Sequence, residues 1–249
     1  DSEKKIFDII KGRRSSEYHA FGDVVQEVWA DVLHRSENRQ EVTGLSTDYK
    51  YLDQMTGGLQ RSDLIILAAR PSIGKTALAL NIAARVALSN RTTADGAVYH
   101  PGVAIFSLEM SRQQVIQRMV CTRAHVPMEL LRKNRMNTRQ VEQFFAAAQE
   151  MRDLPIYVGD TPGLDPTELR LQAQQMQMRD PRLSLIIVDY LQLMSVKRKR
   201  SESRQQEVSE ISRSMKALAR DLDVPVIALS QLSRNIETRR GKDQKPKLS

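Results

Sequence analysis

Cysteine is almost absent from this sequence, which has 249 residues and only Cys121. One cysteine excludes a disulfide within the chain and any zinc site built from several cysteines, and it suits a reducing compartment such as the cytoplasm. No run of about 18 apolar residues occurs, so the sequence predicts no membrane span. The first residues show no signal-peptide core. Internal repeats are also lacking.

Charged residues, in contrast, are plentiful and of both signs. The chain holds 38 Lys and Arg against 30 Asp and Glu, which gives a net charge of +8. This moderate excess favours an anionic partner without identifying it. Hydrophobic residues at 41% and charged residues at 27% are typical of a globular protein and exclude general disorder. Because the first residue is not methionine, we expect a fragment of a longer protein.

Short apolar runs rich in branched residues predict buried strands. Their hydrophobicity is continuous rather than alternating, as in parallel strands that are covered on both faces. Helical spacing occurs at 75–89 and 203–222, and two further helical segments at 111–124 and 138–152 predict an extra layer. The alternation predicts an α/β fold with a mostly parallel sheet flanked by helices. The predicted strands are 64–69, 103–108, 155–158, 185–190 and 225–230.

An isolated amphipathic helix is predicted over residues 16–34, with Ser16 as its N-cap. Phe21, Val25, Val28 and Val32 form one apolar stripe, with Trp29 beside it. A polar stretch then separates this helix from the α/β part. The stripe could pack on its own domain or dock on a neighbouring subunit, and the sequence pattern leaves both readings open.

The segment ARPSIGKT, residues 69–76, predicts a phosphate-binding loop between the first strand and a helix. Such a loop needs small residues whose N–H groups face phosphates, a lysine for their charge and a hydroxyl for Mg²⁺. Gly74, Lys75 and Thr76 meet these needs, and Ala69 departs from the general pattern, which begins with glycine. The expected nucleotide-binding residues are Ala69, Arg70, Pro71, Ser72, Ile73, Gly74, Lys75, Thr76 and Ala77.

Three more polar residues follow apolar strands and suit a nucleotide site. Asp189 closes LIIVDY and can hold the hydration shell of Mg²⁺ beside Thr76, although it could instead cap a turn. Glu109 follows VAIFSL and is placed to activate water, with a role near the Ser111 helix cap as the alternative. Gln231 could sense the γ-phosphate or serve only as a strand-end residue.

These motifs together resemble the DnaB-type replicative helicases. The resemblance rests on GLSTDYKYLDQMTGGLQRSDLIILAARP, PSIGKTALALNIA, VAIFSLEM, LIIVDYLQLM, RQQEVSEISRSMKALAR and VPVIALSQLSR, which occur in the order of that family. It covers roughly residues 43–240. Ala69 is then usual rather than a defect.

The resemblance implies a RecA-like P-loop NTPase fold assembled as a hexameric ring, with ATP and Mg²⁺ between subunits. It also implies 5′→3′ movement on single-stranded DNA and unwinding at a replication fork. Lys75 and Thr76 would serve the triphosphate and Mg²⁺, Glu109 would activate water, Asp189 would act on the magnesium side, and Gln231 would sense the γ-phosphate. The helix 16–34 would be the linker helix that docks on the next subunit. Primase and a helicase loader are the further partners implied, in the nucleoid region of the cytoplasm.

The resemblance also sets the expected domain boundaries. Residues 1–15 would be the tail of a missing N-terminal domain or a linker, 16–42 the linker helix and connector, and 43–249 the motor domain. In this family an arginine finger lies nearer the C-terminus and completes the neighbour's site. We therefore expect this stretch to bind ATP but to hydrolyse it poorly alone.

A basic run, Lys197, Arg198, Lys199 and Arg200, follows the strand that carries Asp189. In RecA-like rings this loop faces the channel, where cations would neutralise DNA phosphates without reading sequence. A solvated basic loop is the alternative. Aromatic residues are only 5% of the chain and none interrupts this run, so tracking of the backbone is favoured over base stacking.

Two other functions share parts of this pattern. A RecA- or RadA-type recombinase has the same core, but the four-cysteine zinc finger of RadA-like proteins is missing and the QLSR segment favours the helicase. A non-catalytic ATP switch, such as a loader-like protein, has less need of a water-activating carboxylate such as Glu109 beside Asp189.

Overall fold

The computed structural model describes residues 20–37, 42–93, 95–194 and 204–232. These residues fall into two units, with the boundary between Thr43 and Gly44. No helix among the described residues is long and apolar enough to cross a membrane.

The first unit contains helix α2 (Phe21–Glu37). The helix begins and ends later than the predicted range of 16–34, and Ala20 before it is not helical. The predicted N-cap Ser16 lies outside the described residues. The apolar side chains of α2 remain exposed, including Phe21, Val24, Val25, Val28, Trp29, Val32 and Leu33.

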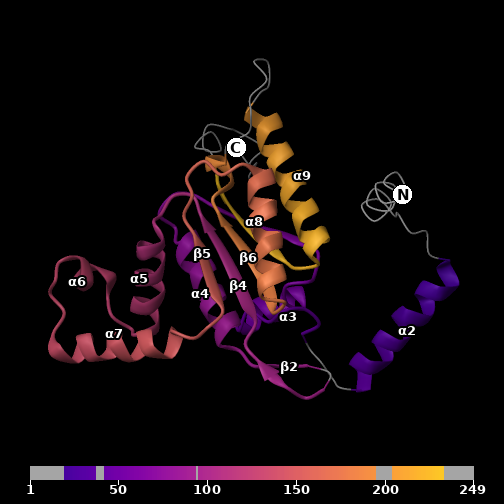
Figure 1. Cartoon of the computed structure of the whole chain (residues 1–249), viewed down its shortest axis with the longest axis horizontal. Helices are drawn as coiled ribbons and strands as arrows, with labels where there is room; N and C mark the ends of the chain where they lie inside the picture. Colours follow the sequence, from indigo (N-terminus) through magenta and orange to yellow (C-terminus); the bar gives the residue numbers. More distant parts are fainter. Residues whose placement is uncertain (1–19, 38–41, 94, 195–203, 233–249) are drawn as a thin grey trace, which may run out of the picture. The chain divides into compact units, whose positions relative to one another are not determined.

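The second unit is built on a sheet of five parallel strands (Figure 1). All five predicted strands are confirmed, with ends that differ by no more than two residues. A short antiparallel pair, β2 (Arg91–Thr92) and β3 (Val98–Tyr99), lies apart from it. The order across the sheet is β1-β7-β6-β4-β5. The strands are β1 (Leu64–Ala69), β4 (Gly102–Ser107), β5 (Ile156–Gly159), β6 (Leu183–Asp189) and β7 (Val226–Gln231).

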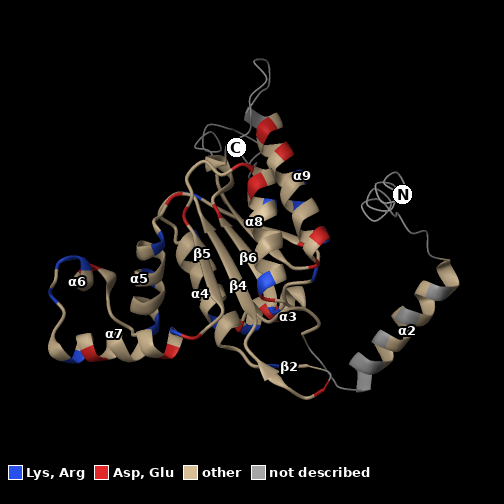
Figure 2. Ribbon diagram, viewed as in Figure 1, with Lys and Arg blue, Asp and Glu red and all other residues tan. Residues whose placement is uncertain are grey.

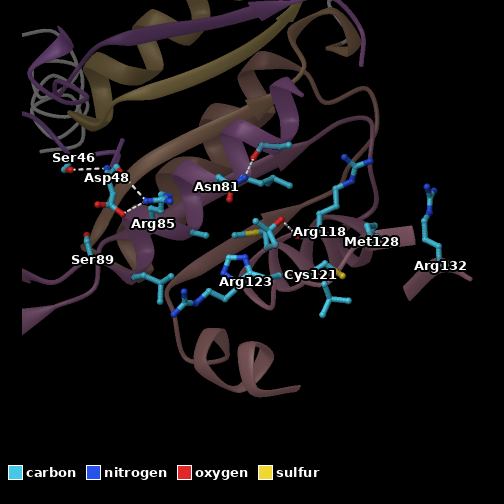
Figure 3. A pocket seen from close by; sticks show the side chains of 18 residues that line it. Ser46, Asp48, Asn81, Arg85, Ser89, Arg118, Cys121, Arg123, Met128 and Arg132 are labelled. Carbon is cyan, nitrogen blue, oxygen red and sulfur yellow. Dashed lines mark hydrogen bonds and ion pairs between the residues drawn. The ribbon is translucent and has the colours of Figure 1, made fainter. Parts of the chain in front are cut away.

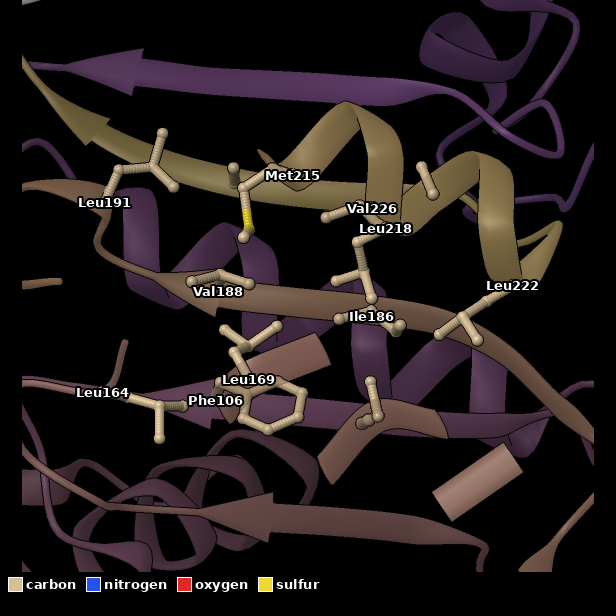
Figure 4. Packing of buried hydrophobic residues seen from close by; sticks show 14 of the residues in the cluster. Phe106, Leu164, Leu169, Ile186, Val188, Leu191, Met215, Leu218, Leu222 and Val226 are labelled. Carbon is tan, nitrogen blue, oxygen red and sulfur yellow. The ribbon is translucent and has the colours of Figure 1, made fainter. Parts of the chain in front are cut away.

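Helices cover both faces of the sheet. Successive strand residues point to opposite sides, so the continuous apolar strands present apolar side chains on both faces. On β6, Ile186 and Val188 pack with α8 (Pro166–Arg179) and α9 (Arg204–Leu222). Figure 4 shows Met215, Leu218 and Leu222 of α9 over this face. The alternate residues of β6, Leu185 and Ile187, pack on the other face with α4 (Lys75–Leu88) and α5 (Arg112–Arg123).

Helix α8 had no clear signal in the sequence. Its segment PTELRLQAQQMQMR is mostly polar, and only Leu169 and Ala173 are buried. The apolar steps of α9, by contrast, predicted it, and its residues Val208, Ile211, Met215, Leu218 and Leu222 are all buried.

The extra helical layer expected between β4 and β5 is present. It consists of α5, α6 (Met128–Arg132) and α7 (Thr138–Met151). Val120, Val126 and Ala147 form a small separate hydrophobic core within this helical layer. Arg132, Lys133 and Arg135, at the end of α6, are exposed. Figure 2 shows Lys and Arg residues gathered at this end of the layer.

A buried carboxylate fixes the loop that leads into the second unit. Asp53 of α3 (Lys50–Thr56) accepts hydrogen bonds from the Ser46 hydroxyl at 2.7 Å and the Thr47 hydroxyl at 2.7 Å. It also accepts from the Thr47 amide at 3.0 Å. These bonds lower the pKa of Asp53 against the opposing effect of burial, which is the largest single influence. The loop is therefore held by charge-assisted bonds.

A second buried carboxylate, Asp180, ties the end of α8 to the start of β6. It accepts from the Arg182 side chain at 2.8 and 2.9 Å, and from the Tyr157 hydroxyl at 2.7 Å. The Arg182 bonds, helped by Tyr157, lower its pKa from 3.8 to about 2 although burial opposes this. Only 6% of Asp180 is exposed, whereas half of the Arg182 side chain is exposed, so solvent screens this ion pair in part.

We expect Asp180→Asn to lower the free energy of unfolding by about 2 kcal/mol at pH 7. Since the folded pKa is the lower one, the stabilisation is complete above the unfolded pKa and is lost as the pH falls from about 4 toward 2. Urea denaturation of both proteins at pH 7 and at pH 3 measures the difference, which should shrink at the lower pH.

Asp221→Asn is the matched control, because Asp221 pairs with Arg170 at the surface. It should cost less than about 1 kcal/mol. Equal losses in the two variants would contradict the structural role of Asp180.

Candidate functional site

The predicted phosphate-binding loop joins the end of β1 to the start of α4. Ser72 and Gly74 have left-handed backbone conformations, with φ of 63° and 103°. A Cβ atom on Gly74 would meet nothing within 4 Å, so this position needs glycine for its conformation and not for lack of space. Helix α4 has no side-chain N-cap. Its first N–H groups therefore end at an exposed loop that is suited to an anion.

Lys75, the first residue of α4, folds back over this loop. Its ammonium donates to the carbonyl of Ala69 at 2.9 Å and to that of Arg70 at 3.4 Å. Both carbonyls belong to the start of the loop, so the cation lies along the path where the predicted phosphates would bind. Pro71, Ser72, Ile73, Gly74 and Ala77 are exposed, whereas Lys75 and Thr76 are half-buried.

The two residues predicted to act on the magnesium side are in direct contact. Thr76 Oγ1 donates to Asp189 Oδ2 at 2.8 Å, although the residues are 113 positions apart. A hydroxyl and a carboxylate are oxygen ligands suited to Mg²⁺, which usually takes one or two protein ligands and completes its shell with phosphates and water. The described residues contain no cluster of three His, Cys, Asp or Glu that could hold a metal unaided. The donor set therefore fits magnesium bound together with a nucleotide.

Burial raises the pKa of Asp189, which is only 5% exposed. The Thr76 hydrogen bond opposes this rise, the Glu109 carboxylate adds to it, and Lys75 and Arg118 counteract it. Two carboxylates and two cations thus act on one another at this edge of the sheet. Such a balance is common where a site must hold a divalent cation and a polyanion.

Glu109 lies in a tight turn after β4. The hydroxyl of Ser107 donates to the carbonyl of Met110 at 2.8 Å and accepts from its amide at 3.2 Å, which closes the turn around Glu109. Ser107 is paired with Asp189 in the parallel ladder. Ser111 caps α5 through Gln114, so the cap is complete without Glu109. The carboxylate of Glu109 is exposed and available for chemistry.

Gln231 is the last residue of β7 and is paired with Ala69 of the phosphate loop. The strand order places β1, β7, β6 and β4 side by side. Ala69, Gln231, Asp189 and Glu109 therefore follow or end four adjacent strands at one carboxyl edge. Ligands of open α/β sheets bind at this edge. The structure thus brings together the described residues that the sequence predicted for a nucleotide site.

A cavity of about 810 Å³ is lined by α4 and α5 and reaches from Ala77, near the start of α4, to Ser89 after its end. Ala77 and Asn81 of α4 and Arg118 of α5 line it, but Lys75, Thr76 and Asp189 do not. Figure 3 shows Asp48 and Arg85 joined at one end and Arg118 and Arg132 toward the other. The cavity is thus a neighbour of the candidate nucleotide site and shares α4 with it.

A family model described as the DnaB-like helicase C-terminal domain matches residues 44–249. The chain belongs to this family. The replicative DNA helicase DnaB of Geobacillus stearothermophilus is 40% identical over 249 residues, covering 100% of this DnaB-like chain and 52% of the relative. DnaB of Rhodothermus marinus is 45% identical over 209 residues, which is 84% of this chain and 21% of the relative.

Solved structures agree with this DnaB-like assignment. One, described as an ATPase domain, has a TM-score of 0.78 at 29% identity, covering 92% of this chain and 76% of that one. A DnaB-like replicative helicase studied with primase has a TM-score of 0.75 at 29% identity, covering 98% and 55%. The predicted RecA-like fold is confirmed. The DnaB-like chain spans about half the length of curated relatives such as the Geobacillus protein.

One predicted group of site residues lies outside the part of the chain that the structure describes, and two residues near the site were not predicted from the sequence. The basic run Lys197, Arg198, Lys199 and Arg200 lies outside the described residues. Arg118 acts on Asp189, yet as one of several arginines on a polar helix it had no distinguishing sequence signal. Gln192, which bonds to the end of β7, lies within the segment LIIVDYLQLM that carries the family resemblance, but that pattern assigned it no role.

We expect Asp189→Asn to raise the melting temperature of this DnaB-like chain at pH 7, and to lower ATP hydrolysis by the full-length protein about 10²-fold or more. Because the folded pKa is raised, the ionised carboxylate destabilises the folded state above that pKa, and the amide removes this cost. The melting difference should shrink as the pH falls to about 4. Calorimetry without Mg²⁺ and a phosphate-release assay measure the two effects.

Asp160→Asn is the control, since Asp160 also follows a strand and accepts from the Arg112 amide at 2.9 Å. An amide oxygen can still accept this bond, so both quantities should change little. A lower melting temperature for Asp189→Asn would contradict the destabilising effect of the buried charge.

Proposed function

We propose that this chain is the ATP-hydrolysing motor of a hexameric replicative DNA helicase. The observation that carries the proposal is the meeting of Lys75, Thr76, Asp189, Glu109 and Gln231 at one edge of the sheet in a member of the DnaB-like family. The motor would hydrolyse ATP between subunits, move 5′→3′ on single-stranded DNA and unwind the duplex at a replication fork.

In this mechanism the loop from Ala69 to Ala77 binds the triphosphate through its N–H groups. Lys75 leaves the carbonyls of Ala69 and Arg70 for the β- and γ-phosphates, because a full negative charge attracts its ammonium more strongly than a carbonyl does. Thr76 and Asp189 would hold Mg²⁺. That ion, when bound, neutralises charge on the phosphates.

Hydrolysis then needs a base and a sensor. Glu109 accepts a proton from a water molecule whose oxygen attacks the γ-phosphorus, and the bond from that phosphorus to the bridging oxygen of ADP breaks. Phosphate and ADP are the products. The side-chain amide of Gln231 donates to the γ-phosphate before cleavage and loses this bond when phosphate leaves.

The ring would be held partly by α2. Its apolar side chains, among them Phe21, Val28, Trp29 and Val32, are exposed in this chain, and an apolar stripe of this kind requires a partner surface. We propose that the linker helix docks on the motor domain of the next subunit. The solved DnaB-like replicative helicase is described with its interactions with primase, which supports primase as a partner here. A helicase loader and a location at the nucleoid in the cytoplasm complete the proposal.

The contact with DNA would involve Lys197, Arg198, Lys199 and Arg200. These residues follow β6, whose last residue Asp189 touches Thr76 of the phosphate loop. Cations at this point of the chain would bind the phosphate backbone of a single strand without reading its sequence. Movement along any sequence requires this kind of contact.

We expect the full-length protein to form hexamers and to displace a strand from a forked duplex only with hydrolysable ATP. Lys75→Ala should abolish displacement, because the charge that binds the β- and γ-phosphates is lost. A gel assay of strand displacement and light scattering with ATP and DNA measure activity and assembly.

Lys50→Ala, which changes an exposed lysine of α3, is the control and should keep full activity. Displacement by the Lys75→Ala ring would contradict the proposed motor. Formation of filaments on DNA would instead favour a recombinase.

Replacing residues 197–200 with serine should reduce the salt dependence of single-strand binding by about 0.7 in log–log slope for each phosphate that is no longer neutralised. Binding titrations at several salt concentrations measure the slope. Serine at Arg132, Lys133 and Arg135, which are exposed at the end of α6, provides the basic-cluster control and should leave the slope nearly unchanged. An unchanged slope in the first variant would remove the run from the DNA contact.

A further inference from the structure

Gln192 makes three hydrogen bonds to the end of a strand that is not its own. It lies in the short 3-10 helix η1 (Leu191–Leu193), which is separated from the end of β6 by Tyr190 alone. Its Nε2 donates to the Ser230 hydroxyl at 2.7 Å and to the Gln231 carbonyl at 3.1 Å. Its Oε1 accepts from the Gln231 amide at 3.3 Å. One side-chain amide therefore serves both backbone groups of Gln231.

These bonds continue a strand pairing at the point where it stops. The ladder between β6 and β7 ends at Val188 with Ala228, whereas β1 remains paired with β7 up to Gln231. The amide of Leu232 donates to Ala69 at 3.2 Å, so it points toward β1. Neighbouring residues of a strand point their peptide groups to opposite sides. The peptide groups of Gln231 therefore point toward β6, where Gln192 takes the place of a strand residue.

We propose that Gln192 is the positioning residue for Gln231, and this inference rests on the proposed ATPase function. Gln231 is held between Ala69 on one side and Gln192 on the other, so its backbone is fixed relative to the phosphate loop. The Ser230 hydroxyl, which is completely buried, strengthens the hold from the preceding residue. A side chain that must meet a γ-phosphate loses much of its effect when it moves by about 1 Å.

Glutamine is suited to this task by its length and its two hydrogen-bonding groups. Glutamate has the same shape but no N–H donor, and its carboxylate would face the carbonyl of Gln231 at the distance now bridged by Nε2. Leucine fills a similar volume without either group. Both substitutions should free the end of β7 while leaving Lys75 and Thr76 untouched.

The test uses the full-length protein with Gln192→Leu, Gln231→Ala and the double variant in an ATPase assay. We expect Gln192→Leu to lower kcat about tenfold or more and to change KM for ATP by less than about threefold. In the Gln231→Ala background the same change should cost less than about twofold, since the two residues act as one unit. Gln177→Leu, which loses an equivalent bond to the carbonyl of Leu222, should keep the wild-type kcat.

Hydrogen exchange provides a readout that does not depend on turnover. In Gln192→Leu the amide of Gln231 should exchange faster, measured in a peptide covering residues 229–232, whereas exchange at Ile227 and in Gln177→Leu should stay as in the wild type. Unchanged exchange at Gln231, or losses of kcat that simply multiply in the double variant, would overturn the positioning role.

The two hypotheses can fail separately. A wild-type protein with no ATPase activity would overturn the proposed function and the positioning role with it. An active wild type whose Gln192→Leu variant keeps its kcat would overturn the positioning role alone.

Discussion

Parallel pairing of β1, β7, β6 and β4 is the constraint on which the candidate site depends. Parallel strands all end at the same edge, so residues far apart in sequence arrive within reach of one another. Thr76 and Asp189, 113 positions apart, are joined by one hydrogen bond for this reason. The continuous apolar strands and the helices on both faces provide the burial that keeps the ladder in register. The positions of the side chains at this edge thus depend on the packing of the helices against the sheet.

The candidate site contains a charged group that lowers the stability of the fold. Asp189 is buried and its pKa is raised, with another carboxylate nearby. A buried charge of this kind lowers stability unless a cation accompanies it. Asp180, at the opposite end of β6, shows the contrary case: Arg182 and Tyr157 satisfy it, and its pKa is lowered. The two ends of β6 therefore lie beside carboxylates of opposite effect: Asp180 has a lowered pKa and Asp189 a raised one.

The positions of residues along this edge also depend on side-chain contacts that the sequence motifs did not predict. The phosphate loop is fixed by its own backbone and by Lys75, but the end of β7 extends beyond its ladder with β6. Gln192 bridges this gap with one side chain. Since η1 begins two residues after Asp189, this carboxylate and Gln192 belong to a single short segment.

The sequence by itself predicted the fold class and the five strands, and the structure confirms both. It also predicted a phosphate-binding loop and gave Lys75, Thr76, Glu109, Asp189 and Gln231 as candidate site residues, whose roles stay predictions. Local patterns suffice for these, because strand burial and phosphate binding impose residue types at fixed spacings. Helix α8 was not predicted, because only two of its residues are buried and most of the others are polar. Only the tertiary structure decided the strand order, the contact of Thr76 with Asp189, the influence of Arg118 and the bonds of Gln192. These contacts join segments that are far apart in the sequence. Local residue patterns do not indicate such contacts, which form only when the strands pair and the helices pack.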